Sequence, residues 1–509
     1  MTSDSQIGSR ITRNALMLYA RMIVTILIGL YTSRVVLEQL GITDFGIYSA
    51  IGSLIALTEF INSSLSSSFS RFFAYQIGHS NKPSNENVFT AAFTISTIAA
   101  FIIIILGQTI GLWYFSNHLE IPTERIEVAK FTYNCILICT ALRVLQLPYS
   151  SCLIAHEKMG AFAYIEILSS ILRLSAAILL IYYLHDKLYT YSVLILAITI
   201  IIFICYFSYS WIKFSDCKYT LHPYPKNTLI QISKFSILDL YGTICYSTRT
   251  HGTALILNSF FGVALNASNA IALSIQNILN GVTGDIITAF NPQIIKQYSV
   301  GAIDTMIDFT FKATRYTFYL FLIIATPLII ETEQILHIWL GNNIPEYSIS
   351  FCRLTIISAG LAIPINILNT CIHATGKIKF LSIGIGSIYL LTLPIIYVAF
   401  KYGLSPNYAY IIYATIMCLI FTLTLLNAKK LIHKLGLYSY YSFVILPIFS
   451  VLIVSTSIPL FCHLILDENL MRVISVTVIS ILTTTGSIIF LGLNNNERKL
   501  LISKIKNRR

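Results

Sequence analysis

Long apolar segments recur along almost the whole chain and are separated by short polar connections. A run of about 20 apolar residues is long enough for a helix to cross the hydrocarbon core of a bilayer. The predicted helices lie at residues 15–36, 45–69, 88–113, 126–149, 162–184, 190–212, 229–257, 265–290, 309–330, 348–371, 380–400, 406–427, 439–463 and 471–493. The pattern therefore predicts an all-α polytopic membrane protein with about fourteen transmembrane helices.

The composition agrees with this class of protein. Of the 509 residues, 56% are apolar and 11% are charged, with a mean hydropathy of +0.74. A soluble domain usually carries about 25% charged residues, so an ordinary soluble enzyme is excluded. An outer-membrane barrel is also excluded, because its strands alternate polar and apolar residues instead of forming long apolar runs. The segment before the first helix is polar and that helix carries Arg21, so we expect a retained span and not a cleaved signal peptide.

The basic residues predict the topology. If the N-terminus is cytoplasmic, twenty-three Lys and Arg residues lie in cytoplasmic connections, helix rims and termini, and five lie on the opposite face. This alternation follows the positive-inside rule and places both termini in the cytoplasm. The formal net charge of +12 is then explained by the basic residues that orient the helices in the membrane. We therefore expect membrane lipids and no nucleic acid among the partners. The ten cysteines are scattered, so we expect buried thiols, no disulfide framework and no metal site.

Two pairs of sequence segments indicate an internal repeat. Ala155–Lys158 matches Ala374–Lys377 at an offset of 219 residues, and each follows a helix with a late proline. A weaker match joins residues 68–78 to residues 289–301. A duplicated six-helix unit has this signature, although chance likeness between amphipathic helix ends is the alternative. The predicted domains are residues 1–228 with helices 1–6, residues 229–434 with helices 7–12, and residues 435–509 with two further helices and a basic tail.

Polar side chains are concentrated on two of the predicted helices, 45–69 and 265–290. Such groups are costly against lipid tails, so they should face other helices or water. They are either packing contacts between helices or the lining of a hydrated cavity that binds a glycan. The candidate glycan-binding residues are Asn62, Ser66, Asn269, Gln276, Asn277 and Asn280.

Charged residues inside the spans are the strongest functional signal. Arginine guanidinium groups match phosphate oxygens bidentately, and carboxylates can bind a coupling cation. The alternative is internal ion pairing that only locks helices together. The candidates for binding an anionic cargo, a diphosphate under the family resemblance given below, are Arg21 and Arg249, with Arg143 and Arg173 in support. The ion-coupling candidates are Glu59, Asp239, Asp285 and Glu166. Six arginines against four carboxylates inside the membrane favour an anionic cargo over a cationic one.

No catalytic motif stands out, because nucleotide-binding, nucleophile-elbow and zinc-protease patterns are missing from the sequence. We therefore expect a protein that is not an enzyme, has no catalytic residues and needs no cofactor, with H⁺ or Na⁺ as the possible coupling ion.

The segment at residues 14–78, above all YTSRVVLEQLG followed two residues later by DFGIY, resembles the bacterial O-antigen and polysaccharide flippases. NPQIIKQY (291–298) and ATGKIKF (374–380) look like landmarks of the second half of the same family. These flippases belong to the superfamily that also contains the multidrug exporters. The resemblance implies two six-helix lobes around a central cavity lined largely by helices 1, 2, 7 and 8, and a rocking type of alternating access.

The resemblance also implies a bacterial inner-membrane protein whose cargo is an undecaprenyl-diphosphate-linked oligosaccharide. The predicted partners are this lipid-linked oligosaccharide and other membrane proteins of polysaccharide assembly. A cation-coupled drug exporter of the same superfamily is the first alternative. A membrane-embedded polysaccharide polymerase is less favoured, because the chain has no large loop or soluble segment for catalysis. A scaffolding protein would not need arginines in the middle of the membrane.

Overall fold

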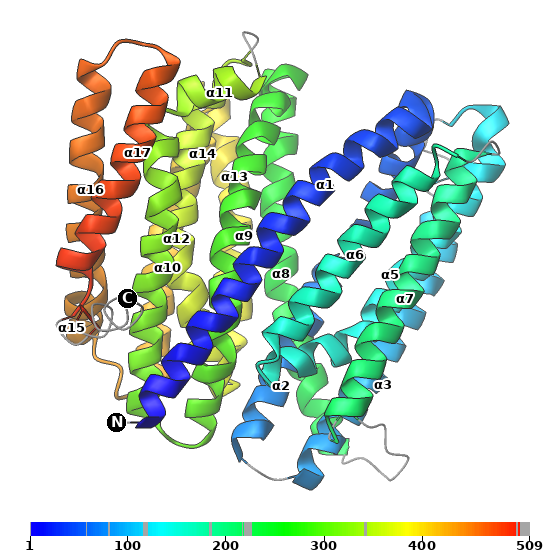
Figure 1. Ribbon diagram of the computed structural model, residues 1–509, viewed down its shortest axis with the longest axis horizontal. Coiled ribbons are helices and arrows are strands. Elements are labelled where there is room, and N and C mark those ends of the chain that lie inside the picture. The colour runs from blue at the N-terminus through cyan, green and yellow to red at the C-terminus, as the bar shows by residue number, and fades with distance from the viewer. Residues whose placement is uncertain are drawn as a thin grey trace, which may run out of the picture. The chain divides into compact units, whose positions relative to one another are not determined.

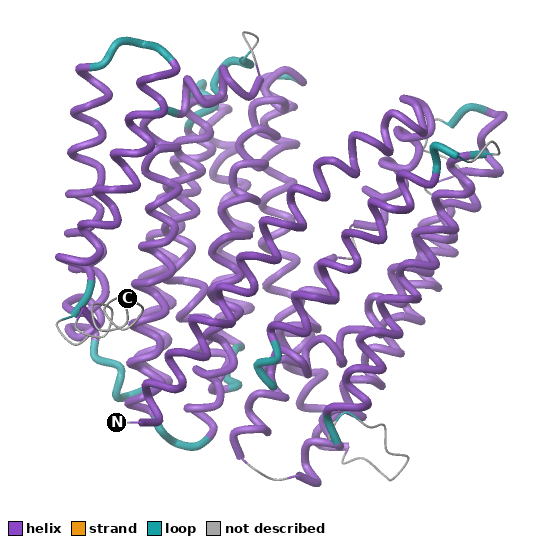
Figure 2. Tube along the Cα trace, viewed as in Figure 1, coloured by secondary structure: helices purple, strands orange, loops and turns teal. Residues whose placement is uncertain are grey.

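The computed structural model describes residues 2–56, 59–79, 82–113, 115, 121–182, 186–215, 217, 226–340, 344–494 and 497–498. Every regular element within these ranges is a helix (Figure 2). Twelve of the described helices are long and apolar enough to cross a membrane. The predicted class, an all-α polytopic membrane protein, is confirmed.

The predicted helices at 15–36 and 45–69 fall on either side of a kink at Gly41. Helix α1 (Thr2–Ala56) continues to Ala56, and α2 (Glu59–His79) follows it. Gly41 has φ +74° and ψ 172°, a conformation that glycine alone adopts readily, so α1 kinks there and then resumes. The predicted spans at 45–69 and 229–257 correspond to α2 and to α8 (Lys226–Phe261), which are helical but are not among the twelve apolar spans.

The chain divides into two compact units, Met1–Thr243 and Ile244–Arg509, here called the N-terminal and C-terminal units. The boundary lies within α8, about four helical turns beyond the boundary at residue 228 that the sequence predicts. Each unit is described by itself below.

The N-terminal unit is organised around α5 (Ile126–Ala155). This helix packs against α2, α3 (Lys82–Leu106) and α7 (Lys187–Lys213), while α1 packs along α6 (Met159–Leu179) (Figure 1). A π-helical turn, η1 (Gly107–Gly111), extends α3, and the 3₁₀ turn η2 (Thr123–Arg125) leads into α5. A buried hydrogen bond of 2.9 Å from Ser192 Oγ on α7 to Thr132 Oγ1 on α5 fixes the two helices side by side.

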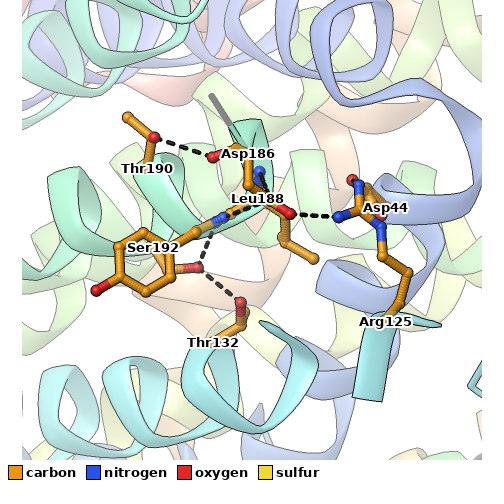
Figure 3. A network of polar contacts seen from close by, with 8 residues as sticks. Asp44, Arg125, Thr132, Asp186, Leu188, Thr190 and Ser192 are labelled. Atoms are coloured by element: carbon orange, nitrogen blue, oxygen red, sulfur yellow. Dashed lines mark hydrogen bonds and ion pairs between the residues drawn. The ribbon is translucent and has the colours of Figure 1, made fainter. Parts of the chain in front are cut away.

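An ionic network ties three helices together at one end of this unit (Figure 3). Arg125, just before α5, pairs with Asp44 on α1 and with Asp186 just before α7. Asp186 also caps α7, because its Oδ1 accepts hydrogen bonds from the backbone N–H groups of Leu188 and Tyr189 at 3.1 Å. The segment after the kink of α1 is thereby held next to the first turns of α5 and α7.

The C-terminal unit repeats the same order of neighbours around α12 (Ser348–Thr375). This helix packs against α9 (Val263–Ser299), α10 (Ile303–Ile330) and α14 (Tyr408–Leu431). The short helix α11 (Thr332–Leu340) follows α10, and a π-helical turn, η3 (Phe380–Ile385), opens α13 (Gly386–Lys401). Both central helices carry a buried proline, Pro148 in α5 and Pro364 in α12.

A helical hairpin completes the C-terminal unit and packs on α10 (Figure 1). Its first arm consists of α15 (Leu437–Tyr440), η4 (Tyr441–Ile445) and α16 (Leu446–Ile465), and its second arm of α17 (Leu470–Ser487) and η5 (Ile488–Gly492). These arms are close to the predicted spans at 439–463 and 471–493. The hairpin is the part of the chain that the sequence predicts as an addition to the two six-helix domains.

The expectation that the chain has no disulfide was wrong. Cys152, near the end of α5, and Cys217, in the connection after α7, are joined by a disulfide. The two cysteines are 65 residues apart in the sequence, and they meet because α5 and α7 pack side by side. This proximity is a consequence of tertiary packing, which cysteine spacing does not reveal.

Candidate functional site

A cavity of about 320 Å³ lies inside the N-terminal unit, between α1, α5, α6 and α7. Its wall combines two arginines with hydroxyl, aromatic and apolar side chains, and none of the lining residues is acidic. The lining residues are Thr25, Ile28, Gly29, Thr32, Ser33, Val36, Phe45, Tyr48, Arg143, Ser170, Arg173, Tyr191 and Ile195. A positively charged, partly polar cavity within helices of membrane-spanning length is a candidate binding site for an anion.

Arg143 on α5 and Arg173 on α6 supply the charge of this cavity. Both side chains are exposed, and within the described structure neither guanidinium forms an ion pair or a hydrogen bond. Their like charges repel one another, and Glu166 attracts Arg173 from two helical turns away on α6. An arginine pair without a partner is costly in a membrane, so an anion that enters the cavity gains two charge-assisted binding groups at once.

The remaining wall of this cavity is suited to a polar ligand. Thr25 and Thr32 on α1 donate their hydroxyl protons to the carbonyls of Met22 and Ile28, which leaves their oxygen lone pairs as acceptors. The rings of Tyr48 and Tyr191 meet edge to face, with centroids 5.2 Å apart. Tyrosine rings combine an apolar face with a polar tip, which is typical of carbohydrate-contacting and aromatic-contacting surfaces alike.

Arg21 lies elsewhere on α1 and does not line this cavity. Its guanidinium lies 5.3 Å from the ring centroid of Phe162 on α6. Glu166, also on α6, accepts a 2.8 Å hydrogen bond from the hydroxyl of Tyr206 on α7. Arg21 and Glu166 are therefore held within the packed helices next to the cavity.

A second, much smaller cavity of about 20 Å³ lies in the C-terminal unit, where it brings together three of the predicted residues. Arg249 on α8 is 6% exposed and stacks on Tyr413, while Asn269 and Gln276 reach the cavity from α9. Asn269 is fixed in place, because its Oδ1 accepts a 2.7 Å hydrogen bond from the Tyr410 hydroxyl on α14.

The other predicted residues do not line either cavity. Asn62 and Ser66 lie on α2, the first buried and the second half-buried. Asn277 and Asn280 are exposed on α9. Asp239 is half-buried on α8, and Asp285 is buried on α9. Glu59 begins α2, but its side chain lies outside the described part of the structure.

Aromatic and hydroxyl residues that are not among the candidates predicted from the sequence complete both cavities. Tyr48 and Tyr191 line the first cavity, and Thr355 and Tyr413 line the second. Tyrosine within an apolar span was an available signal, because a buried Tyr hydroxyl needs a polar partner. No group of His, Cys, Asp and Glu in the described ranges could hold a metal ion.

No protein-family model matches the chain, and no curated protein matches its sequence. Solved structures match its fold. An outward-facing multidrug resistance MATE family transporter of the MOP superfamily aligns with a TM-score of 0.74 at 15% identity, over 84% of this chain and 97% of that one. A MATE structure in the straight conformation aligns with a TM-score of 0.72 at 16% identity over the same shares. The chain therefore has the fold of the MATE transporters.

A third match is a MOP superfamily transporter from Pyrococcus furiosus, with a TM-score of 0.65 at 16% identity over 84% of this chain and 96% of that one. It is described as having a binding pocket of reversed polarity that suggests a different function.

Proposed function

We propose that this protein is a membrane transporter that carries an anionic cargo across the bilayer by alternating access. The observation that supports this proposal is the cavity of about 320 Å³ with no acidic lining residue, in which Arg143 and Arg173 form no ion pair with a described residue. An arginine pair binds phosphate or diphosphate oxygens bidentately, whereas it repels a cationic drug. The MATE fold supports transport as the general activity.

The cargo that fits best is an undecaprenyl-diphosphate-linked oligosaccharide, moved from the cytoplasmic to the periplasmic leaflet of a bacterial inner membrane. Arg143 and Arg173 would bind the diphosphate, because their cavity has room for it, and hydroxyl-bearing side chains such as Thr25 and Thr32 would contact the sugars. The sequence likeness of residues 14–78 to polysaccharide flippases supports this choice of cargo. Other membrane proteins of polysaccharide assembly would then supply and consume the cargo.

A cation-coupled multidrug exporter is the second candidate. Two of the matched structures are MATE proteins, and one is described as a multidrug resistance transporter. Glu166, which lies near Arg173, would then be the carboxylate that binds the coupling cation. Removing the positive charge of the cavity should slow transport if the cargo is anionic and speed it if the cargo is a cationic drug.

The test is transport by purified protein in proteoliposomes that contain a fluorescently labelled lipid-linked oligosaccharide. An enzyme or quencher that acts on one leaflet measures how much of the label has crossed. We expect Arg143→Gln and Arg173→Gln each to slow translocation by roughly ten- to a hundredfold, the loss of one charge-assisted interaction. Lysine at either position should restore part of the rate, because it retains the charge but not the bidentate geometry.

Arg353→Gln is the matched control, since Arg353 is an exposed arginine on α12 whose Nε donates to the carbonyl of Ile329. This variant should translocate the cargo at the wild-type rate. Unchanged translocation in the Arg143→Gln, Arg173→Gln double variant would refute the anionic cargo. If the same double variant exports a cationic dye faster than the wild type, the multidrug alternative is correct.

A further inference from the structure

Arg249 is a buried cation without a counter-charge. It lies in the half of α8 that belongs to the C-terminal unit, and 6% of its surface is exposed. Its guanidinium lies 3.6 Å from the ring centroid of Tyr413, and Nη2 donates a 3.1 Å hydrogen bond to Thr250 Oγ1. Its Nε atom is buried and has no hydrogen-bond partner. Contacts with neutral groups do not offset the cost of removing a guanidinium from water.

Among the described residues, no carboxylate forms an ion pair with Arg249. The described ion pairs of the C-terminal unit do not include Arg249, and none of the residues around its cavity is acidic. By contrast, the buried Arg315 and Arg472 in the same unit each pair with a glutamate. A buried arginine is normally paired, because a single uncompensated charge destabilises the fold by several kcal/mol. The site therefore needs an anion that is not part of the chain.

The cavity next to Arg249 supplies further hydrogen-bond donors. Thr355 on α12 is 2% exposed, lines the cavity and has a hydroxyl with no partner in the structure. Gln276 on α9 also lines it, and its amide forms no hydrogen bond with a described residue. Asn269 uses its oxygen to accept from Tyr410, so its amide N–H groups remain as donors. A guanidinium, a hydroxyl and two amides around one small space are the donors that an anion requires.

The size of the cavity selects the kind of anion. The free space is about 20 Å³, which is room for one particle of about the size of a water molecule. A phosphate, a sulfate or a carboxylate has several heavy atoms and would need the surrounding side chains to move apart. We propose that the C-terminal unit binds one monatomic anion, a halide such as chloride, between α8, α9, α12 and α14, with Arg249 as its main ligand.

This site is separate from cargo binding. The cargo is assigned to the N-terminal unit, whereas the halide would neutralise a charge that is part of the C-terminal unit itself. The halide therefore acts as a structural ion, and its binding should stabilise the protein whether or not cargo is present. Loss of transport in Arg143 or Arg173 variants would leave halide binding unchanged, so the two proposals fail independently.

The first experiment measures the melting temperature of the full-length protein in detergent as sodium gluconate is replaced by sodium chloride or sodium bromide. Sodium concentration and ionic strength stay constant. We expect a saturable rise of about 2–5 °C with either halide, because the ligand binds the folded state alone. Sodium phosphate at the same ionic strength should give no such rise.

Arg249→Gln should abolish the halide response, and Arg353→Gln, which changes an exposed arginine, should retain it. If Arg249→Gln does not fold, Thr355→Val tests the site instead, because it replaces the unpartnered hydroxyl with a methyl group of similar size and should weaken the halide response several-fold. A halide response of wild-type size in both variants would overturn the proposal, as would a wild type that does not respond to halide.

The second experiment locates the ion. Crystals of the wild-type protein grown in sodium bromide should show an anomalous scattering peak in the cavity beside the Arg249 guanidinium and Thr355 Oγ1. The chloride form should show density without that peak. A peak that is missing from this cavity, with ordinary water density in its place, would show that the space is hydrated and contains no halide.

Discussion

At the scale of single residues, the positions of charged groups decide what each contributes. Arg143 and Arg173 face a cavity, Arg315 pairs with Glu497 at 2.8 Å, and Arg249 is buried with aromatic and hydroxyl neighbours. The same residue type therefore serves as a candidate ligand-binding group, as a structural ion pair and as a candidate ion ligand. Burial and the nearest acidic group distinguish these roles, and neither can be read from a single position in the sequence.

Asp44 allows a prediction about pH at this scale. Burial raises the pKa of its carboxyl above the ordinary value of 3.8 and the nearby Asp186 adds to this, while Arg125 opposes both. The folded state therefore favours the protonated form. The stability that protonation contributes is fully present below pH 3.8 and is lost as the pH rises through the raised pKa. Asp44→Asn should make the melting temperature less dependent on pH in this window.

The measurement is thermal unfolding in detergent between about pH 3.5 and pH 6, the range around and above the ordinary carboxyl pKa. Asp304→Asn is the control, because Asp304 is an exposed carboxylate, 78% of whose side chain is accessible, and its ion pair with Lys434 lies at the surface. The control should have the pH profile of the wild type. If Asp44→Asn also keeps that profile, Asp44 does not titrate in the way described.

At the scale of helices, the hairpin of α16 and α17 is fastened to α10 by polar contacts at both ends. At one end, Arg315 on α10 pairs with Glu497 and donates to the carbonyl of Gly492 at 3.2 Å. At the other end, the Glu331 carboxylate pairs with His463 Nδ1 at 2.8 Å and with Arg472 Nη2 at 3.4 Å. Helices in a membrane have little hydrophobic drive to associate, so these contacts help to fix the hairpin on the unit.

Glu331→Gln should loosen this hairpin. The variant leaves the buried Arg472 without its closest carboxylate partner, and removing one member of a buried pair costs about 3 kcal/mol. We expect a lower melting temperature and faster proteolysis within residues 465–470. Glu333→Gln, two residues away and exposed, is the matched control and should behave as the wild type. Equal stability of both variants would mean that apolar packing alone holds the hairpin.

At the scale of the whole molecule, the two units share one arrangement of helices around α5 and α12, and each contains a cavity with arginine in its wall. The cavities differ in size by more than tenfold, about 320 Å³ against about 20 Å³. The larger one has room for part of a cargo, and the smaller one has room for a single ion. Similar packing has thus produced sites of different chemistry in the two units.

The distribution of basic residues predicts the orientation of the chain in the membrane. A reporter fused after Arg509 or inserted at Gly301 should report the cytoplasm, and one inserted at Gly403 should report the opposite side, because Lys and Arg are concentrated on the cytoplasmic face. Gly301 and Gly403 both lie in connections between described helices, so insertions there are tolerated best. If all three reporters indicate the opposite sides of the membrane, the predicted orientation of the chain is wrong.

The fold class could be predicted from the sequence because apolar run length is a local property. The runs at 309–330 and 406–427, for example, correspond to α10 and α14 within a few residues. The failures have physical reasons as well. The short helix α11 has too few residues to be seen as an apolar run, and the Cys152–Cys217 disulfide depends on the packing of α5 against α7.

The sequence by itself determined that the chain is a helical membrane protein and which arginines lie inside its spans, since cost in a bilayer depends on residue type. Only the tertiary structure decided how those arginines are grouped. Arg143 and Arg173 are 30 residues apart, and they share a cavity because α5 and α6 contribute to the same wall. Arg249 meets Thr355 through packing of α8 and α12 around one cavity. Such groupings depend on contacts between distant segments, which no local pattern encodes.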